Sequence, residues 1–192
     1  MKLTEDWRDL ALQCDAVCFG SLAQRNFLSR ETIHLFLSLT KISANRIFDV
    51  NLRQHFFPND VLRDSLNAAT IVKLNHEELP IVADMFQIAG TNEIERAENL
   101  REIFDLELIC ITRGSNGSLL VSAKGISESI GNEIEIADTI GAGDAFTAAM
   151  TPGILRGWDL DKINQKANRV AAFVASQLGA MPAISNEILM SI

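Results

Sequence analysis

The chain has 192 residues, of which 47% are hydrophobic and 22% are charged, and this balance predicts a single globular domain over residues 1–192 with a sizeable core. Its net charge of −8 argues against a surface that follows nucleic-acid phosphates, so an anionic ligand would need a local positive site. No apolar run has the length of a membrane span, and residues 1–10 lack the apolar core of a signal peptide. We therefore expect a cytoplasmic protein with no membrane and no nucleic-acid partner.

The cysteines do not predict a metal cluster, because their number is odd and no pair has CxxC spacing. Cys18 and Cys110 lie in apolar, strand-like runs. In such runs a reduced cysteine serves as a small hydrophobic side chain, so we expect that role for both.

Short apolar runs alternate along the chain with longer segments of helical period. Several of the runs are rich in β-branched residues, and they predict buried strands at residues 15–20, 46–51, 70–75 and 108–113. Between residues 91 and 104, apolar side chains recur at helical spacing with charged residues between them, which predicts a helix with one buried face. Residues 114–125 suggest a hairpin turn that enters a further strand.

Strands separated by helices of this length predict an α/β fold, with a mainly parallel sheet and helices on both faces. Ligands of such sheets bind beyond the carboxyl ends of the strands. The polar motifs FDVNLR, KLNHEEL, TRGSNG and DTIGAGD all fall at predicted strand ends or follow them. Their order along the chain favours one ligand site over four unrelated loops.

The stretch DTIGAGD, residues 138–144, has the pattern of a phosphate-binding turn. The first backbone N–H groups of a helix are unpaired and partly positive, and Gly141 and Gly143 would let a phosphoryl group approach them. A carboxylate at Asp144 would repel phosphate, but it is suited to taking a proton from an attacking hydroxyl. The alternative is that Asp144 only caps the helix.

Asn75 and Glu78 would share one face of a helix that began at residue 75, where they could hold the hydration shell of Mg²⁺ on ATP phosphates. The alternative is a plain helix start with acidic residues in its first turn. Arg53 follows a predicted strand end, where it could neutralise a phosphate or pair with Asp49. Pro152 lies in the helix expected after Asp144 and predicts a kink or an early end.

With these motifs in place, the sequence resembles the PfkB-type carbohydrate kinases, the ribokinase and fructokinase family. Residues 138–144 match the family's C-terminal signature in full, and residues 75–78 are similar to its Asn-x-x-Glu element. Residues 112–117 resemble its nucleotide loop, and residues 179–182 its closing segment. The resemblance implies a ribokinase-like three-layer αβα fold and ATP-dependent phosphorylation of a sugar hydroxyl, a phosphotransferase reaction to an alcohol group.

The resemblance also implies roles for individual residues. Asp144 would be the base, and Gly141, Ala142 and Gly143 would form with it the anion hole for the transferred phosphoryl group. Asp138 and Thr139 would help to place phosphate and, in some members, a monovalent cation such as K⁺, although a plain Asx-turn would explain Asp138 as well. The resemblance implies further contacts to Mg²⁺ and ATP at Glu78 for the metal and at Asn75, Thr112, Gly114, Gly117 and Asn168 for the nucleotide.

The segments FGSLAQRN and FDVNLRQ are similar to the fructokinase branch, which makes fructose the first choice of sugar. Family members begin with a further stretch that carries most sugar contacts and the β-lid, and the chain resembles only the part after it. We therefore expect an N-terminally truncated kinase domain, impaired when alone and prone to form homo-oligomers through uncovered apolar surface. The alternative is a non-catalytic nucleotide-binding or regulatory module, although such a module has no need of a base at Asp144.

Overall fold

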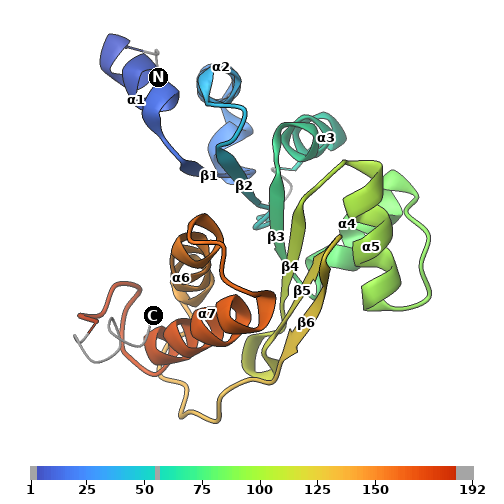
Figure 1. Cartoon of the computed structure of the whole chain (residues 1–192), viewed down its shortest axis with the longest axis vertical. Helices are drawn as coiled ribbons and strands as arrows, with labels where there is room; N and C mark the ends of the chain where they lie inside the picture. The colour runs from blue at the N-terminus through green and yellow to red at the C-terminus, as the bar shows by residue number, and fades with distance from the viewer. Residues whose placement is uncertain (1–3, 55–56, 185–192) are drawn as a thin grey trace. The chain divides into compact units, whose positions relative to one another are not determined.

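The computed structural model describes residues 4–54 and 57–184 (Figure 1). The chain folds into two compact units. The first unit contains Met1–Cys110 and Val121–Ala123, and the second contains Ile111–Leu120 and Lys124–Ile192.

The first unit alternates helices with parallel strands. Its elements are α1 (Glu5–Gln13), β1 (Ala16–Gly20), the 3₁₀ turn η1 (Leu22–Arg25), α2 (Phe27–Leu39), β2 (Asn45–Asp49), α3 (Asn59–Ala68), β3 (Ile71–Asn75), α4 (Glu78–Phe86), α5 (Glu93–Ile103) and the first part of β4 (Leu108–Thr112), which continues into the second unit. In register, Ile47 of β2 lies between Cys18 of β1 and Ile71 of β3. Ile47, Phe48 and Ile71 are fully buried or nearly so, which puts the core of this unit around its central strands.

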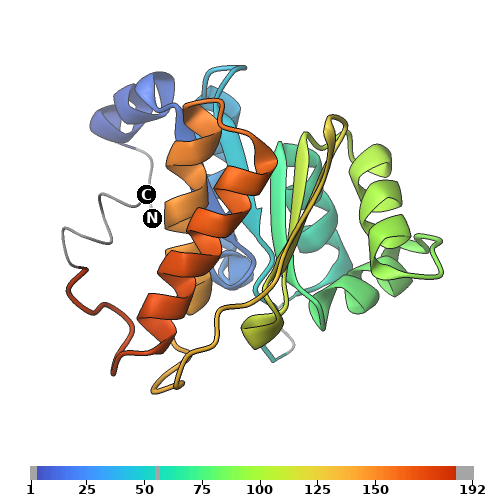
Figure 2. The ribbon, with the colours of Figure 1, turned by 60° about the horizontal axis from the view of Figure 1, so that its bottom comes forward.

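The second unit contains the end of β4, the 3₁₀ turn η2 (Gly114–Asn116), the first part of β5 (Ser118–Ser122), β6 (Gly125–Ser129), α6 (Ala142–Leu155) and α7 (Leu160–Ala175). Helices α6 and α7 pack along each other, and α7 also packs on β6 (Figure 2). Gly153 of α6 makes this close packing possible, because a Cβ there would lie 2.9 Å from the Ile163 side chain of α7. The six strands follow the order β1-β2-β3-β4-β5-β6.

These elements confirm the predicted α/β fold, including the strands expected at residues 15–20, 46–51, 70–75 and 108–113. The helix expected within residues 91–104 is α5, whose N-cap Asn92 accepts a hydrogen bond from the backbone N–H of Glu95. Asp159 caps α7 in the same way. The expected turn into a strand after residue 114 is also present, as η2 and β5.

The ends of two helices bear on the sequence predictions. Helix α4 begins at Glu78 and not at residue 75, because Asn75 is the last residue of β3. Helix α6 continues past Pro152 and ends at Leu155, so the helix does not stop at the proline, and a kink there stays a prediction.

The cysteine prediction holds for one residue and fails for the other. Cys110 is completely buried, and burial raises the pKa of its thiol to about 12. Cys18 is exposed, although its neighbour Phe19 is buried. Side chains of a strand point alternately to its two faces, and β1 is the first strand of the sheet, where the face that carries Cys18 is uncovered.

Among the described helices, none combines the length and the apolar character that crossing a membrane requires.

Candidate active site

The DTIGAGD turn is tied together by the carboxylate of Asp138. Its Oδ1 accepts a hydrogen bond from the backbone N–H of Ile140 at 2.9 Å, which is the Asx-turn considered from the sequence. Its Oδ2 accepts from the backbone N–H of Gly179 at 3.3 Å, so it also joins the turn to the segment after α7.

Gly141 is required where these two segments meet. Its φ of 82° lies in the left-handed region, and a Cβ at this position would overlap the carbonyl oxygen of Ala180. A side chain here would push apart the turn and the closing segment, so the glycine fixes how closely they approach.

Helix α6 begins directly after this glycine, and its first turn is open to an anion. The N–H of Ala142 donates to the carbonyl of Thr139 at 3.3 Å, and the N–H of Ala145 donates to the carbonyl of Gly141 at 2.8 Å. The N–H groups of Gly143 and Asp144 find no acceptor among residues 4–54 and 57–184. Asp144 is itself exposed in this first turn, so two free donors and a carboxylate lie at the positive end of a 14-residue helix.

The other predicted nucleotide residues of the second unit have two different surroundings. Thr112 ends β4 and is half-buried, and the loop after it closes through the N–H of Arg113, which donates to the carbonyl of Gly117 at 2.8 Å. Gly117 has a φ of 90° and no room for a Cβ beside the carbonyl of Ser129. Gly114, in contrast, faces open space and has a φ of 58°.

Asn168 belongs to a buried polar cluster of the second unit. Its side-chain amide donates to the hydroxyl of Ser118 at 2.6 Å and to the side-chain oxygen of Asn164 at 3.0 Å. Asn164 in turn donates to the carbonyl of Ser127 at 3.0 Å. The amide of Asn168 is thus used to fix α7 to β5 and β6, and its predicted contact to a nucleotide stays a prediction.

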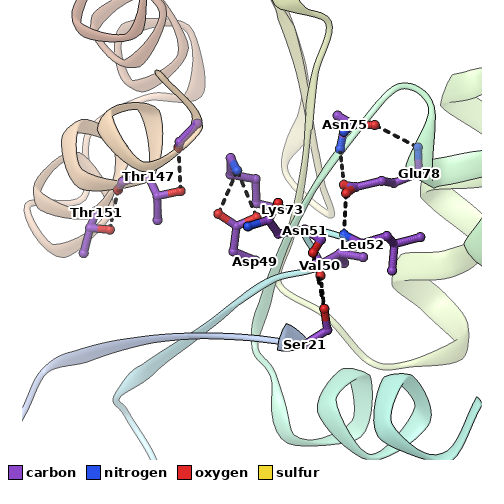
Figure 3. Close-up of polar contacts among 11 residues, drawn as sticks. Ser21, Asp49, Val50, Asn51, Leu52, Lys73, Asn75, Glu78, Thr147 and Thr151 are labelled. Carbon is purple, nitrogen blue, oxygen red and sulfur yellow. Dashed lines mark hydrogen bonds and ion pairs between the residues drawn. The ribbon is translucent and has the colours of Figure 1, made fainter. Parts of the chain in front are cut away.

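In the first unit, Asn75 and Glu78 bind each other's backbone (Figure 3). The side-chain oxygen of Asn75 accepts from the N–H of Glu78 at 2.8 Å, and Glu78 Oε2 accepts from the N–H of Asn75 at 2.8 Å. This reciprocal pair has the form of a capping box and ties the end of β3 to the first residue of α4. Glu78 Oε1 accepts a third bond, from the N–H of Leu52 at 2.7 Å.

The carboxyl group of Glu78 is buried, and burial raises its pKa although the bonds from Asn75 and Leu52 act in the opposite direction. Within the described residues, no group of three or more His, Cys, Asp or Glu side chains could hold a metal ion directly. The predicted role of Glu78, to hold water of the Mg²⁺ hydration shell, stays a prediction.

Sequence reasoning missed a buried ion pair at the end of β2. Lys73 Nζ lies 2.9 Å from Asp49 Oδ1 and 2.8 Å from Oδ2, and the two residues are direct partners in the β2–β3 register (Figure 3). Desolvation lowers the pKa of Lys73, but the charge and hydrogen bonds of Asp49 outweigh it and leave the pKa raised. Asp49 is thus paired with Lys73 and not with Arg53, which is exposed and donates only a long bond to the Leu52 carbonyl.

The predicted site residues therefore form two sets. Asn75 and Glu78 are brought together by the first unit, whereas Asp138 and residues 141–144 are brought together by the second. A sequence model described as "pfkB family carbohydrate kinase" matches residues 2–187. The chain belongs to this family of carbohydrate kinases.

Comparison with known members of the pfkB family gives the same result. The chain is 32% identical over 181 residues to an uncharacterized sugar kinase from Pyrococcus horikoshii, covering 90% of this chain and 54% of the relative. It is 28% identical over 148 residues to the aminoimidazole riboside kinase of Salmonella typhimurium, covering 72% of this chain and 44% of that enzyme. The chain thus spans about half the length of these curated relatives.

Solved structures of pfkB kinases resemble the chain closely. The P. horikoshii kinase in complex with ATP matches with a TM-score of 0.74 at 32% identity, covering 90% of this chain and 55% of that one. The fructokinase of Vibrio cholerae, bound to fructose, ADP and calcium, matches with a TM-score of 0.71 at 26% identity, covering 86% and 56%. These neighbours confirm the ribokinase-like character of the fold.

Proposed function

We propose that this chain is the ATP-binding part of a kinase that transfers the terminal phosphoryl group of Mg²⁺·ATP to a hydroxyl group of a sugar. The observation that carries the proposal is the first turn of α6, where the free N–H groups of Gly143 and Asp144 adjoin an exposed carboxylate. ATP complexes of a 32% identical relative support the choice of nucleotide.

In the proposed reaction, the sugar oxygen forms a bond to the terminal phosphorus of ATP while the bond to the ADP oxygen breaks. The Asp144 carboxylate accepts the proton that leaves the attacking hydroxyl. The N–H groups of Gly143 and Asp144 stabilise the charge that develops on the transferred phosphoryl oxygens. Gly141 contributes by holding these donors at the edge of the turn, where no side chain excludes the phosphate.

Bound Mg²⁺ would neutralise charge on the ATP phosphates, and Asn75 and Glu78 are the residues assigned to its water ligands. Thr112, Gly114, Gly117 and Asn168 are assigned to the nucleotide, as the family resemblance implies. A monovalent cation such as K⁺ near Asp138 and Thr139 also belongs to this proposal, as do the cytoplasmic location and the absence of a nucleic-acid partner.

Fructose is the proposed sugar, with the Vibrio cholerae fructokinase as its support. Matches to an aminoimidazole riboside kinase and to a yeast adenosine kinase make a panel of acceptors necessary. The second candidate function is a non-catalytic nucleotide-binding or regulatory module, and the observation that favours it is that the free N–H groups of Gly143 and Asp144 could bind a phosphate without any transfer.

Calorimetric titration of the 192-residue chain with Mg²⁺·ATP tests the nucleotide site. Asparagine tolerates a left-handed backbone, so Gly141→Asn and Gly157→Asn place the same residue at φ values of 82° and 65°. Only at position 141 would the new Cβ overlap the backbone, at Ala180. We expect Gly141→Asn to weaken ATP binding about tenfold or more and Gly157→Asn to leave it unchanged. Equal ATP affinities in the two variants would show that the turn is not part of the ATP site.

Transfer itself is tested in a chimera that adds the part of the P. horikoshii kinase without a counterpart in this chain. We expect coupled assays of ADP release to show sugar-dependent turnover in the chimera and negligible turnover with fructose in the 192-residue chain, because positioning of the acceptor carries much of phosphoryl transfer. ATP binding without turnover on any acceptor in a folded chimera would favour the non-catalytic module.

A further inference from the structure

A group of basic side chains surrounds Trp158 at the turn between α6 and α7. Lys162 Nζ lies 4.1 Å from the centre of the indole ring, Lys166 Nζ 5.1 Å and the Arg156 guanidinium carbon 5.3 Å. Arg169 follows Lys166 by three residues and so lies on the same side of α7. We call Arg156, Trp158, Lys162, Lys166 and Arg169 the Trp158 cluster.

The indole ring at the centre of the Trp158 cluster is held in place by α6. The backbone N–H of Trp158 donates to the carbonyl of Gly153 at 3.0 Å. A Cβ on Gly153 would lie 3.1 Å from Cε3 of the ring, so the ring lies against the helix where only a glycine leaves it room. The basic side chains therefore surround an indole ring that is packed against α6 and fixed in position.

Three cations of the cluster have no carboxylate partner. Arg156, Lys162 and Arg169 form no ion pair in the part of the chain that the structure describes. Asp159 and Asp161 are close in sequence, and Asp159 Oδ1 already accepts the backbone N–H of Lys162 at 2.8 Å. Positive charge is thus gathered around Trp158 in a chain whose net charge is −8.

Mutual repulsion within the cluster is visible at Lys166. Desolvation lowers the pKa of its ammonium group, and the charges of Lys162, Arg169 and Arg156 lower it further. An anion bound among these groups would lessen this repulsion.

The geometry selects the shape of the anion. Because three cationic heads converge within 5.3 Å of one ring centre, they match a compact, multiply charged group better than an extended polyanion or a flat acidic surface. Cations already lie over the indole, which leaves less room for a stacked base. Arginine and lysine together favour phosphate oxygens, which accept several charge-assisted hydrogen bonds at once.

The Trp158 cluster is distinct from the proposed phosphate turn. Helix α6 carries the turn at its first residues and ends at Leu155, and its 14 residues span roughly 20 Å. One phosphate chain bound at Asp144 could not reach the cluster at the other end of the helix. Arg156 at the C-terminal end of α6 also complements the negative end of the helix dipole.

We propose that the Trp158 cluster is a second anion site, which binds a short polyphosphate group through Arg156, Lys162, Lys166 and Arg169. The group could belong to a nucleotide or to an inorganic polyphosphate, since both present the same oxygens. The proposal does not rest on the kinase reaction, because no residue of the cluster belongs to the proposed active site.

Trp158 itself provides the measurement. The chain contains only two tryptophans, so Trp7→Phe leaves Trp158 as the single reporter. The full 192-residue chain with this change is titrated with sodium tripolyphosphate, with ATP and with sodium sulfate while indole fluorescence is recorded. We expect a saturable change with tripolyphosphate that weakens as salt is added, and a weaker response to sulfate.

The double variant Lys162→Ala with Lys166→Ala tests the cluster. The control variant is Lys41→Ala, because Lys41 lies outside the cluster and pairs with Asp15. We expect the double variant to lose about tenfold or more in affinity for tripolyphosphate and the control to lose none. If ATP changes the Trp158 fluorescence with the same affinity as tripolyphosphate, the cluster accepts the phosphate chain of a nucleotide. If only tripolyphosphate changes it, the ligand is an inorganic polyphosphate.

An absent fluorescence response, or an equal affinity in the double variant with unchanged circular dichroism, would overturn the proposal. A signal that depends on protein concentration instead of on added anion would indicate that the cluster contacts a second copy of the chain, which would overturn it as well. If the double variant does not fold, the single variant Lys162→Gln, which changes one exposed head group, gives the same comparison.

Discussion

The two aspartates of the DTIGAGD motif have different surroundings. The carboxylate of Asp144 is exposed and makes no hydrogen bond to the described part of the turn, so it does not cap the helix, whereas the carboxylate of Asp138 uses both oxygens to hold that turn together. We expect Asp144 to act on the acceptor hydroxyl, and Asp138 to keep the donors in place.

The first prediction is that Asp144→Asn lowers turnover by roughly 10²–10⁴ in a form of the enzyme that can bind its sugar, because a general base acts in the transition state. ATP affinity should change little, since asparagine keeps the size of the side chain and does not touch the N–H donors. Steady-state kinetics and calorimetry on the chimera measure the two effects separately. Turnover similar to that of the parent would rule out a base at this position.

Glu78 should make the stability of the protein depend on pH in an unusual direction for a carboxylate. Burial raises its pKa in the folded state above the ordinary value of 4.5, so folding favours the protonated form. Its contribution to the free energy of unfolding is therefore fully present below pH 4.5 and falls as the pH rises through the folded pKa.

The measurement compares urea unfolding of the wild type with that of Glu78→Gln at a series of pH values from 4.5 upward. Glutamine does not titrate, so the stability of the wild type minus that of the variant isolates Glu78. We expect this difference to decrease as the pH rises. A difference that increases with pH would mean that the bonds from Asn75 and Leu52 outweigh burial.

At the scale of the elements, β2 and β3 carry the two partners of the buried Asp49–Lys73 ion pair. The side chains are only 12% and 7% exposed, so removing one partner would leave a buried charge uncompensated. We expect Lys73→Met to lower the free energy of unfolding by about 3–5 kcal/mol.

The double variant Asp49→Leu with Lys73→Met is the control for this prediction. It removes both charges, so it should recover most of the stability that the single variant loses, and the difference is a coupling energy between the two residues. Urea unfolding of Asp49→Leu, Lys73→Met and the double variant gives the three losses of unfolding free energy. If the loss in the double variant equals the sum of the two single losses, the pair is not coupled.

The strands of the first unit show which features of the fold could be predicted from the sequence. Apolar runs located β1 to β4 because their side chains are buried, and burial leaves a pattern in the sequence. The reciprocal bonds between Asn75 and Glu78 at the start of α4 were not predicted, because they depend on a contact between two side chains and the backbone and not on periodicity. Lys73 was overlooked because its partner lies 24 residues away, although a charge in each of two apolar runs was the available signal.

The candidate site was predictable where the chemistry is local. Residues 138–144 carry their own turn, helix start and carboxylate within one motif, so their arrangement follows from neighbouring residues. The buried cluster of Asn168 and the cations around Trp158 bring together residues from different elements. Such arrangements depend on how helices and strands pack, and a single sequence does not record that packing.

At the scale of the whole molecule, apolar surface on the first unit should make the chain associate with itself. Phe27, Leu28 and Leu35 of α2 are 71%, 62% and 49% exposed, and Leu10 and Leu12 of α1 are both more than half exposed. Large apolar side chains gathered on neighbouring helices favour contact with another protein surface. The relatives are about twice as long, so a complete member has further chain available to cover such a surface.

The last prediction is therefore that the 192-residue chain forms oligomers or aggregates whose size increases with protein concentration and is maintained or raised by added salt. Hydrophobic association does not weaken as ionic screening increases, whereas association through charges would weaken. Light scattering and sedimentation at low and high salt distinguish the two. Phe27→Ser with Leu28→Ser should shift the chain toward the monomer, while Ile42→Ser should not, because Ile42 is 98% exposed but lies in the turn before β2 and outside both helices. A monomer at all concentrations in the parent chain would show that the apolar side chains of α1 and α2 do not form an adhesive surface.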